Sequence, residues 1–298
     1  MTSLCTQSWS DWPAVPPLLS QQVWVWRLHL KDWPQEAGDE SGLTIAEQDR
    51  ARRYRRPQDR QRFVLTRCWL RRLLGVYLER DPRAWDFEFT PTRKPFLSGC
   101  PILFNLSHSG DWALLAFCRD RPLGIDVEAH RSAPVLSLAR RFFQPSELAT
   151  LEALPPTQQE QLFFDYWTAK EAYLKATGEG LGALSRVLVD ERAIEGDRRA
   201  LWRCWSESDA ARDGKFGEEG HRPAAEAQRL SLEPGYSAAI VVGPPGGELF
   251  SESLLRQYVT KFNNKSAGIR IYLGTISPKM RPLPLANLDS VKSTEFLK

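Results

Sequence analysis

The chain has 298 residues, 42% of them hydrophobic and 26% charged, and its net charge of +3 is too small to indicate a partner by itself. The five cysteines are widely spaced without a Cys-x-x-Cys pair, and no apolar run reaches the about 18 residues that a membrane helix needs. A disulfide framework, a zinc site, secretion and a membrane span are therefore disfavoured, and we expect a cytoplasmic protein.

The first part of the chain is predicted to hold a strand followed by two helices. Residues 1–20 show no periodicity and are expected to form an irregular N-terminal arm. Alternating apolar residues from Gln22 to Leu30 predict a half-buried strand. Thr44 and Glu47 form a capping box that begins a short helix, and apolar residues at helical spacing predict a longer helix from Asp59 to Leu78.

Helix followed by strands then occurs a second time. Strands are expected from Asp111 to Cys118 and from Leu123 to Val127, a helix from Gln158 to Thr177, and further strands from Arg186 to Val189 and from Ala238 to Val242. The segments 110–116 and 235–241 also resemble each other. Because short strands often look alike, the pattern alone leaves open whether the chain contains a duplication.

Two further segments carry little periodicity. Residues 206–229 are charged with almost no large apolar side chains, so they are expected to form a surface loop. Residues 246–298 contain apolar pieces but no second core, and we treat them as a C-terminal extension of unknown role.

Basic charge is concentrated between Arg50 and Arg72, where ten arginines fall in 23 residues that hold a single acid, Asp59. An exposed helical face is the simplest interpretation for any one of them. For the group, a polyanionic ligand is favoured, because arginine binds phosphate in a bidentate manner and like charges four residues apart destabilise a helix. Nucleic acid and a phosphorylated small molecule both stay open at this point.

Acidic residues form the second chemical pattern. Asp126 and Glu128 are two residues apart in a predicted strand, so their carboxylates share a face and would suit Mg²⁺ with phosphate. Glu171 and Lys175 share a helical face beside the bulky Trp167. A solvated strand edge and a surface ion pair are the simpler interpretations, whereas a metal ligand or base and a phosphate-binding lysine are the functional ones.

The third pattern is the small polar segment from Phe104 to Gly110, which we expect to be a turn that exposes hydroxyl and amide donors to a phosphate. Ser107 and His108 suggest a hydrolase. Sequence neighbours rarely form a nucleophile and its base, however, and the chain has no Gly-x-Ser-x-Gly motif, so hydrolysis through Ser107 is disfavoured.

In their order and spacing these motifs resemble the 4'-phosphopantetheinyl transferase superfamily, in its long, pseudo-dimeric Sfp-like branch. The resemblance rests on an Arg-rich helix, Lys94-Pro95, Asn105-x-Ser107-His108-Ser109, Gly124-Ile125-Asp126-Val127-Glu128, Arg141-Phe142-Phe143 with Glu147, and Trp167-x-x-Lys170-Glu171-x-x-x-Lys175. It extends from Val23 to Val242 and leaves both ends of the chain uncovered.

The resemblance implies roles for individual residues. Asp126, Glu128 and Glu171 would bind Mg²⁺, with Glu171 also the base that takes a serine proton and a water on the metal as the alternative base. Lys175 would contact the phosphates. Contacts to coenzyme A are implied for six residues: Arg53, Arg62, Lys94, Pro95, Ser107 and His108.

The reaction implied is transfer of the 4'-phosphopantetheine arm from coenzyme A to a serine of an acyl or peptidyl carrier protein, with release of adenosine 3',5'-bisphosphate. The implied fold is α+β, with two similar α/β subdomains related by a pseudo-twofold axis and the active site at their interface. We place the coenzyme A-binding subdomain at residues 21–122 and the metal-binding subdomain at 123–245. A monomer without nucleic-acid or membrane partners is expected.

Two alternatives belong to other classes of protein. A nucleic-acid-binding module could use the arginine run, but it would not explain clustered carboxylates that repel a phosphate backbone. Another Mg²⁺-dependent phosphotransferase is the nearer chemical alternative.

Overall fold

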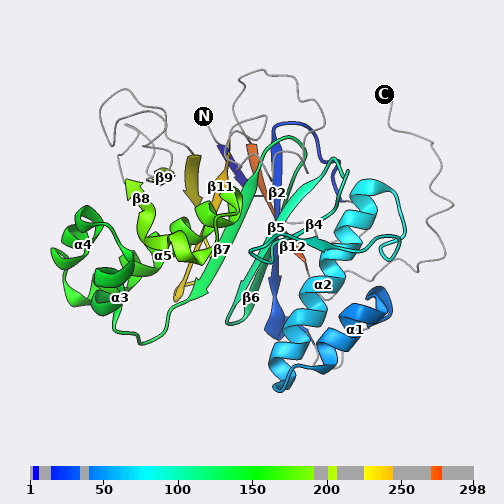
Figure 1. Ribbon diagram of the computed structural model, residues 1–298, viewed down its shortest axis with the longest axis horizontal. Coiled ribbons are helices and arrows are strands. Elements are labelled where there is room, and N and C mark those ends of the chain that lie inside the picture. Colours follow the sequence, from blue (N-terminus) through cyan, green and yellow to red (C-terminus); the bar gives the residue numbers. More distant parts are fainter. Residues whose placement is uncertain are drawn as a thin grey trace.

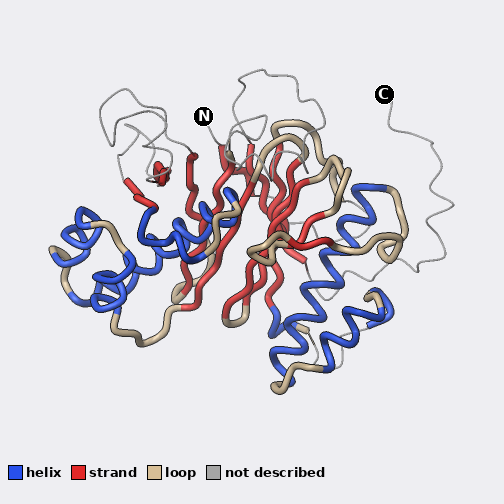
Figure 2. The backbone as a smooth tube through the Cα atoms, in the orientation of Figure 1, coloured by secondary structure: helices blue, strands red, loops and turns tan. Residues whose placement is uncertain are grey.

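Two five-stranded sheets and the helices that cover them make up the α+β fold of this computed structural model (Figure 1, Figure 2). The structure describes residues 3–6, 15–33, 40–190, 201–206, 225–243 and 270–276. In Figure 1 the strands lie in the middle, with helix α2 on one side of them and helix α5 on the other.

The first sheet has the order β1-β12-β2-β6-β5. Its strands are β1 (Ser3–Thr6), β12 (Arg270–Ile276), β2 (Gln22–His29), β6 (Trp112–Cys118) and β5 (Leu103–Ser109). The expected strands at β2 and β6 are confirmed, but β2 is buried on both faces instead of one. Trp24 and Trp26 face α2, while Val23 and Val25 face the second sheet.

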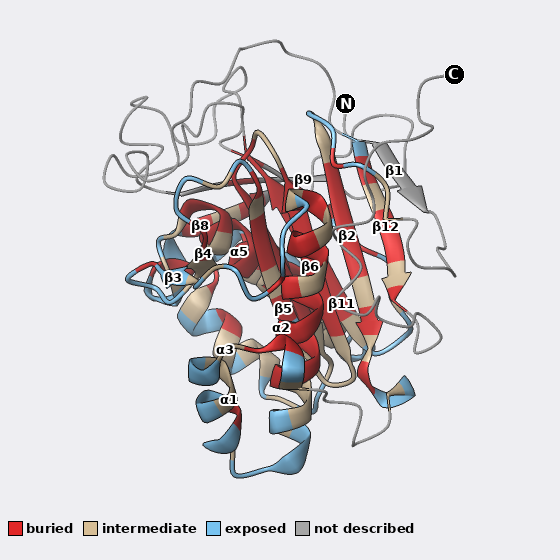
Figure 3. Cartoon of the chain, turned by 90° about the vertical axis from the view of Figure 1, so that its right-hand side faces the viewer, coloured by how far each residue is buried: buried red, intermediate tan, exposed pale blue. Residues whose placement is uncertain are grey.

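Helices α1 (Ile45–Arg52) and α2 (Pro57–Leu78) follow β2 and confirm the two expected helices. The capping box is present, with the Glu47 carboxylate accepting a hydrogen bond from the Thr44 amide. Figure 3 shows α2 largely buried along its length and α1 largely exposed. A small hairpin, β3 (Glu88–Phe89) and β4 (Pro95–Phe96), leads from α2 to β5.

The second sheet has the order β7-β11-β10-β9-β8. Its strands are β7 (Leu123–Ala129), β11 (Tyr236–Val242), β10 (Ala225–Arg229), β9 (Leu201–Ser206) and β8 (Val187–Asp190). Between β7 and β8 come α3 (Val135–Phe142), α4 (Pro145–Glu152) and α5 (Pro156–Thr177), of which α5 packs on the sheet. As expected, α5 ends at Gly178, whose φ of 80° suits glycine.

The two sheets are joined in two ways. An apolar core lies between them, formed by β2, β6 and β12 from one sheet and β7 and β11 from the other. At their edges, polar side chains of β5 bond to the backbone of β7: the amides of β7 residues 125, 127 and 129 donate to Asn105, Ser107 and Ser109 respectively. Residues two apart on a strand share a face, which is why these three side chains reach the same neighbour.

Four expectations from the sequence need correction. The N-terminal arm contains β1, and the C-terminal extension contains β12, which lies between β1 and β2 and pairs parallel with both. The expected surface loop contributes β10. The expected turn from Phe104 to Gly110 is strand β5, because its polar residues are used to join β7. Among the described helices, none is long and apolar enough to cross a membrane.

Candidate active site

Three carboxylates meet where β7 packs on α5. Asp126 and Glu128 project from one face of β7, and Glu171 projects from α5; oxygen atoms of all three lie within 4.8 Å of one another. Gly124 permits this close packing, because a Cβ there would lie only 2.0 Å from the carbonyl oxygen of Ala172 in α5. The glycine and the two acids of the Gly-Ile-Asp-x-Glu motif therefore serve one site.

Lys175, one helical turn after Glu171, contacts polar side chains from all three elements that form the site. Its Nζ lies 2.5 Å from Asp126 Oδ1 and 3.9 Å from Glu171 Oε2. It also donates to the Ser107 hydroxyl at 3.2 Å, and that hydroxyl donates to Asp126 Oδ1 at 2.7 Å. The site thus draws side chains from β5, β7 and α5.

Burial and crowding shift the ionisation of these groups. Burial, and then repulsion by Asp126, raises the pKa of Glu171 to about 7, although Lys175 acts in the opposite direction. Burial and Asp126 likewise raise the pKa of Glu128. Burial alone would lower the pKa of Lys175, but attraction to Asp126 and Glu171 outweighs it and raises that pKa.

The donor set fits a divalent cation. Asp126 Oδ2 is buried and has no hydrogen-bond partner in the described part of the chain, although a buried carboxylate oxygen normally has one. Three carboxylates offer only oxygen ligands, which suit Mg²⁺ or Ca²⁺ rather than a soft metal. A hard cation would supply the missing partner of Asp126 and offset the repulsion that raises the pKa values of the two glutamates.

The residues expected to contact coenzyme A are distributed around this centre. Ser107 is buried, and its hydroxyl is already bonded to Asp126, Lys175 and the Val127 amide. His108 on β5 keeps part of its surface exposed to solvent, but the protein packed around its imidazole, and then the nearby Arg62 cation, lowers its pKa. Arg62 also donates to the Gly110 carbonyl, which fixes it beside the β5–β6 turn.

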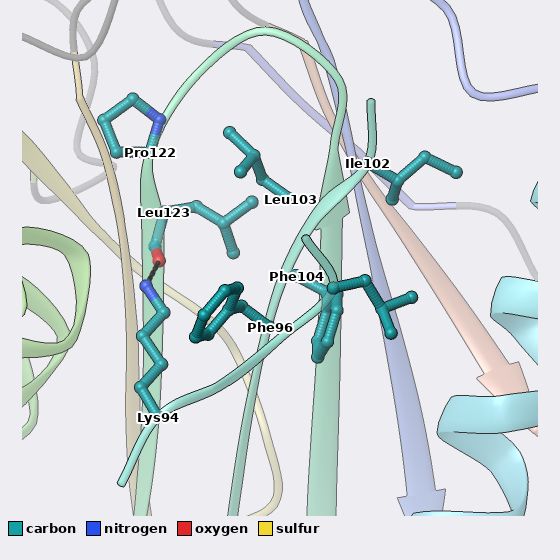
Figure 4. A pocket seen from close by; sticks show the side chains of 8 residues that line it. Lys94, Phe96, Ile102, Leu103, Phe104, Pro122 and Leu123 are labelled. Atoms are coloured by element: carbon teal, nitrogen blue, oxygen red, sulfur yellow. Dashed lines mark hydrogen bonds between the residues drawn. The ribbon is translucent and has the colours of Figure 1, made fainter. Parts of the chain in front are cut away.

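Lys94 directly precedes strand β4, which begins at Pro95, and its side chain reaches the start of β7. The Lys94 ammonium donates to the carbonyls of Leu123 and Lys175, at 3.0 and 2.6 Å. Figure 4 shows it at the edge of a small pocket whose other walls are mainly apolar. Burial, and then the Lys175 cation, lowers the pKa of Lys94 to about 7.

The arginine run divides into two kinds of residue. Arg67 and Arg71 are buried in α2 and paired with Glu47, so they join α2 to α1 and do not form a polyanion-binding surface. Arg53 is exposed just after α1. The expectation that the whole run is a binding face is therefore wrong for its buried members.

Three residues that the sequence motifs contain, but to which no role was assigned, also shape the site. Asn105 and Ser109 join β5 to β7, and the Ser109 hydroxyl also donates to Glu128 at 2.8 Å. Trp167 forms a side-chain hydrogen bond with Glu171. The alternation of Asn105, Ser107 and Ser109 at every second residue was the signal that could have revealed the polar strand.

Comparison with known proteins agrees with this geometry. Two family models match: "4'-phosphopantetheinyl transferase superfamily" over residues 122–225 and "4'-phosphopantetheinyl transferase, N-terminal" over 26–119. The first match contains all three clustered carboxylates and Lys175.

Curated relatives extend the match beyond single motifs. The 4'-phosphopantetheinyl transferase HetI of Nostoc is 39% identical over 205 residues, which cover 65% of this chain and 86% of HetI. The transferase psf-1 of Bacillus pumilus is 30% identical over 72% of this chain and 85% of its own length. Sfp of Bacillus subtilis is 31% identical over 47% of this chain and 62% of Sfp. Matches of this extent, over a chain that clusters the motif acids in one site, show that it belongs to the 4'-phosphopantetheinyl transferase superfamily, in its Sfp-like branch.

Proposed function

We propose that this chain transfers the 4'-phosphopantetheine arm of coenzyme A to a serine of an acyl or peptidyl carrier protein, in a reaction that requires Mg²⁺. The observation that carries the proposal is the cluster of Asp126, Glu128 and Glu171 within 4.8 Å, with Lys175 bonded to Asp126. Phosphoryl transfer depends mainly on positioning and on neutralising charge, and this set of groups supplies both.

Asp126, Glu128 and Glu171 would hold the metal ion. When bound, Mg²⁺ would neutralise charge on the pyrophosphate of coenzyme A and favour an in-line arrangement of the reacting groups. The buried, unpartnered Asp126 Oδ2 supports this assignment, since the neighbouring oxygen of the same carboxylate already serves Lys175 and Ser107.

Glu171 is the base that accepts the proton of the carrier serine. It lies within 4.8 Å of the other two carboxylates of the cluster, which places a proton acceptor beside the proposed metal. The serine oxygen then bonds to the β-phosphorus as the bond to the bridging oxygen breaks, and adenosine 3',5'-bisphosphate leaves. Lys175 would stabilise the negative charge on that leaving group, because its ammonium is held beside the carboxylates by Asp126.

Binding of coenzyme A would involve basic groups of β5, of α2 and of the end of α1. Arg53, Arg62 and His108 are our candidates for the 3'-phosphate, with Ser107 and Pro95 as further contacts. Arg62 donates a hydrogen bond to the Gly110 carbonyl, two residues after His108, and its cation lowers the histidine pKa; both observations support a shared anion site.

The experiment is to incubate the chain with coenzyme A, Mg²⁺ and an apo carrier domain, and to weigh the carrier by mass spectrometry. We expect a mass gain of one phosphopantetheine group, lost on addition of EDTA. Asp126→Ala should lower the rate by at least about 100-fold, whereas Asp86→Ala, which removes an exposed carboxylate outside the cluster, should not. A chain that leaves fatty-acid, polyketide and peptide carriers all unmodified would contradict the proposal.

We also infer that residues 21–122 and 123–245 are two copies of one α/β unit, related by a pseudo-twofold axis. In each half a capping-box glutamate bonds a cation of the long helix: Glu47 pairs with Arg71, and Glu147 pairs with Lys170. If this is right, α2 should superpose on α5 when the two sheets of an experimental structure are overlaid. Because one chain then supplies both sides of the site, light scattering should show an active monomer.

A further inference from the structure

The ammonium of Lys94 has an unusual set of partners for a residue expected to bind phosphate. Its two hydrogen bonds within the described residues go to backbone carbonyls, those of Leu123 and Lys175. Leu123 is the first residue of β7, and Lys175 lies in the last turn of α5. A single side chain therefore joins the start of the strand and the end of the helix that together carry the catalytic groups.

Lys94 is held rigidly enough to act as such a link. The Thr90 hydroxyl accepts a hydrogen bond from the Lys94 amide, and the Thr90 amide donates to the Lys94 carbonyl. Thr90 is itself buried, and it bonds Thr92, which packs beside Gly180 just beyond α5. The β3–β4 hairpin is thus fixed on both sides of Lys94.

The backbone that Lys94 contacts belongs to a residue of the site. Lys175 offers its carbonyl to Lys94 and its Nζ to Asp126 and Ser107. A carbonyl in the last turn of a helix lacks a partner further along the helix, and a cationic donor there is favourable. Loss of the donor would free the last turn of α5, and Lys175 Nζ would move with it.

We propose that Lys94 is a positioning residue that fixes the end of α5 against the start of β7, and that its side chain is not a ligand for the 3'-phosphate of coenzyme A. The catalytic consequence rests on the proposed transferase function. The link itself rests only on the two hydrogen bonds and on the hairpin that presents the lysine.

The chemistry of the ammonium group agrees with this role. A neutral amine still carries two N–H donors, which is the number that the two carbonyls require. Burial lowers the pKa of Lys94 to about 7, so the group can hold both carbonyls with or without its charge. A phosphate ligand, in contrast, would depend on the charge.

The experiment compares Lys94→Met with wild type, using coenzyme A and 3'-dephospho-coenzyme A as substrates. Arg93→Met is the matched control, because it removes an exposed cation from the neighbouring position of the same hairpin. Lys94→Gln retains two N–H donors without a charge and should preserve more of the link than Lys94→Met. Hydrogen exchange of the amides at residues 174–178 is measured on all four proteins without any substrate.

For Lys94→Met we expect kcat to fall about 10- to 100-fold, as for a catalytic group displaced by about 1 Å, while KM for coenzyme A changes less than about threefold. The preference for coenzyme A over its dephospho form should stay at the wild-type value, and exchange at the end of α5 should become faster. For Lys94→Gln, kcat and the exchange rate at the end of α5 should both lie between the values for Lys94→Met and for wild type.

Two results would overturn the proposal. If Lys94→Met raised KM and abolished the preference for the 3'-phosphate, the side chain would be a substrate ligand. If exchange at residues 174–178 were unchanged, the link would not hold the helix end. A wild-type chain that modified no carrier would refute the proposed function alone, because hydrogen exchange would still test the link.

Discussion

The two carboxylate oxygens of Asp126 have different surroundings, and the difference indicates which groups the site has and which it lacks. Oδ1 accepts hydrogen bonds from Lys175 and Ser107, whereas Oδ2 is buried without a partner in the described residues. Beside it, Glu171 and Glu128 have raised pKa values because they are buried near another carboxylate. Without a cation the cluster therefore destabilises the fold, which is a common property of sites arranged for a charged ligand.

Glu171→Gln should show that the carboxylate cluster lowers stability without a cation and binds one when it is present. In EDTA the variant should melt at a higher temperature than wild type, because the substitution removes a buried, repelled carboxylate. Adding Mg²⁺ should raise the melting temperature of wild type but not of the variant, since binding to the native state stabilises it. The measurement is a thermal melt with and without the metal, with Glu152→Gln as the control for an exposed carboxylate. A variant that melted below wild type in EDTA would argue against a repulsive cluster.

Lys94 makes a prediction about pH. Its pKa is lowered from 10.5 to about 7 on folding, by burial and by the neighbouring Lys175 cation. Between those pH values the unfolded chain binds the extra proton, so this group makes stability rise with pH from about 7 to about 10. Urea unfolding at pH 7 and pH 9 should therefore show that Lys94→Met costs more stability at the higher pH. An equal cost at both values would mean that the lysine is not desolvated in the native state.

At the scale of elements, the contact between β7 and α5 determines whether the catalytic groups meet. Every second residue of β7 faces α5, and these residues are Gly124, Asp126 and Glu128. At Gly124 the helix backbone is so close that no side chain fits. The glycine therefore sets the distance across which Glu171 and Lys175 reach the strand.

Gly124→Ala should force α5 away from β7. A Cβ would lie 2.0 Å from one backbone atom of α5 and 2.5 Å from another, and neither can move without shifting the helix. We expect a loss of about 3 kcal/mol in the free energy of unfolding, near the upper end for overpacking, together with loss of transfer activity. Gly182→Ala is the matched control, since a Cβ there would meet nothing within 4 Å. Wild-type activity in the folded Gly124→Ala protein would contradict the argument.

Lys170 and Glu171 are neighbours in the same motif but belong to different interactions. The Lys170 ammonium is fully buried and bonds Glu147 at 2.7 Å, and Glu147 in turn accepts from the Val189 amide. Lys170 thereby joins α5, α4 and β8, on a different face of the helix from Glu171 and the carboxylate cluster. Of these two neighbouring residues, Lys170 therefore stabilises the fold, and Glu171 belongs to the proposed active site.

Lys170→Met should lower stability rather than catalysis. Removing one partner of a buried ion pair leaves an uncompensated charge and costs about 3–5 kcal/mol. Denaturant unfolding should show this loss, while transfer assays well below the melting temperature should stay near the wild-type rate. If instead the rate collapsed in a variant of normal stability, Lys170 would have to contact the reacting groups.

The helices and strands also differ in how well they could be predicted from the sequence. The apolar pattern identified α2, α5, β2, β6 and β7, because the two helices repeat an apolar face at helical spacing and the three strands are short apolar or alternating runs. It failed for β5, where Asn105, Ser107 and Ser109 look like turn residues but use their polarity to bond the β7 backbone. Strand spacing paired Asp126 with Glu128, and the family resemblance added Glu171 to them, whereas the bonds from Lys94 to two carbonyls depend on how distant elements pack.

At the scale of the whole molecule, the ends of the chain complete the first sheet. Strand β12 lies between β1 and β2, and its Tyr272 ring stacks on Trp24 at 4.6 Å. At Gly274 the backbone of β12 approaches the Trp26 ring so closely that a Cβ would lie 2.7 Å from it. Pairing between segments so far apart in sequence leaves no local signal, which is why the sequence indicated only an arm and an extension.

A chain shortened to end at residue 243 should therefore lose stability, although all the proposed catalytic residues remain. It would lose the buried side chains of Ile271, Leu273 and Ile276, worth about 5 kcal/mol together, and it would leave the edge of β2 open to pair with another chain. A chain ending at residue 278, which keeps β12, is the matched control. Urea unfolding should show the loss only in the shorter chain, light scattering should show it associating, and a peptide of residues 268–278 added in trans should reverse both effects. Equal stability of the two shortened chains would mean that β12 is dispensable and that β2 closes the sheet without it.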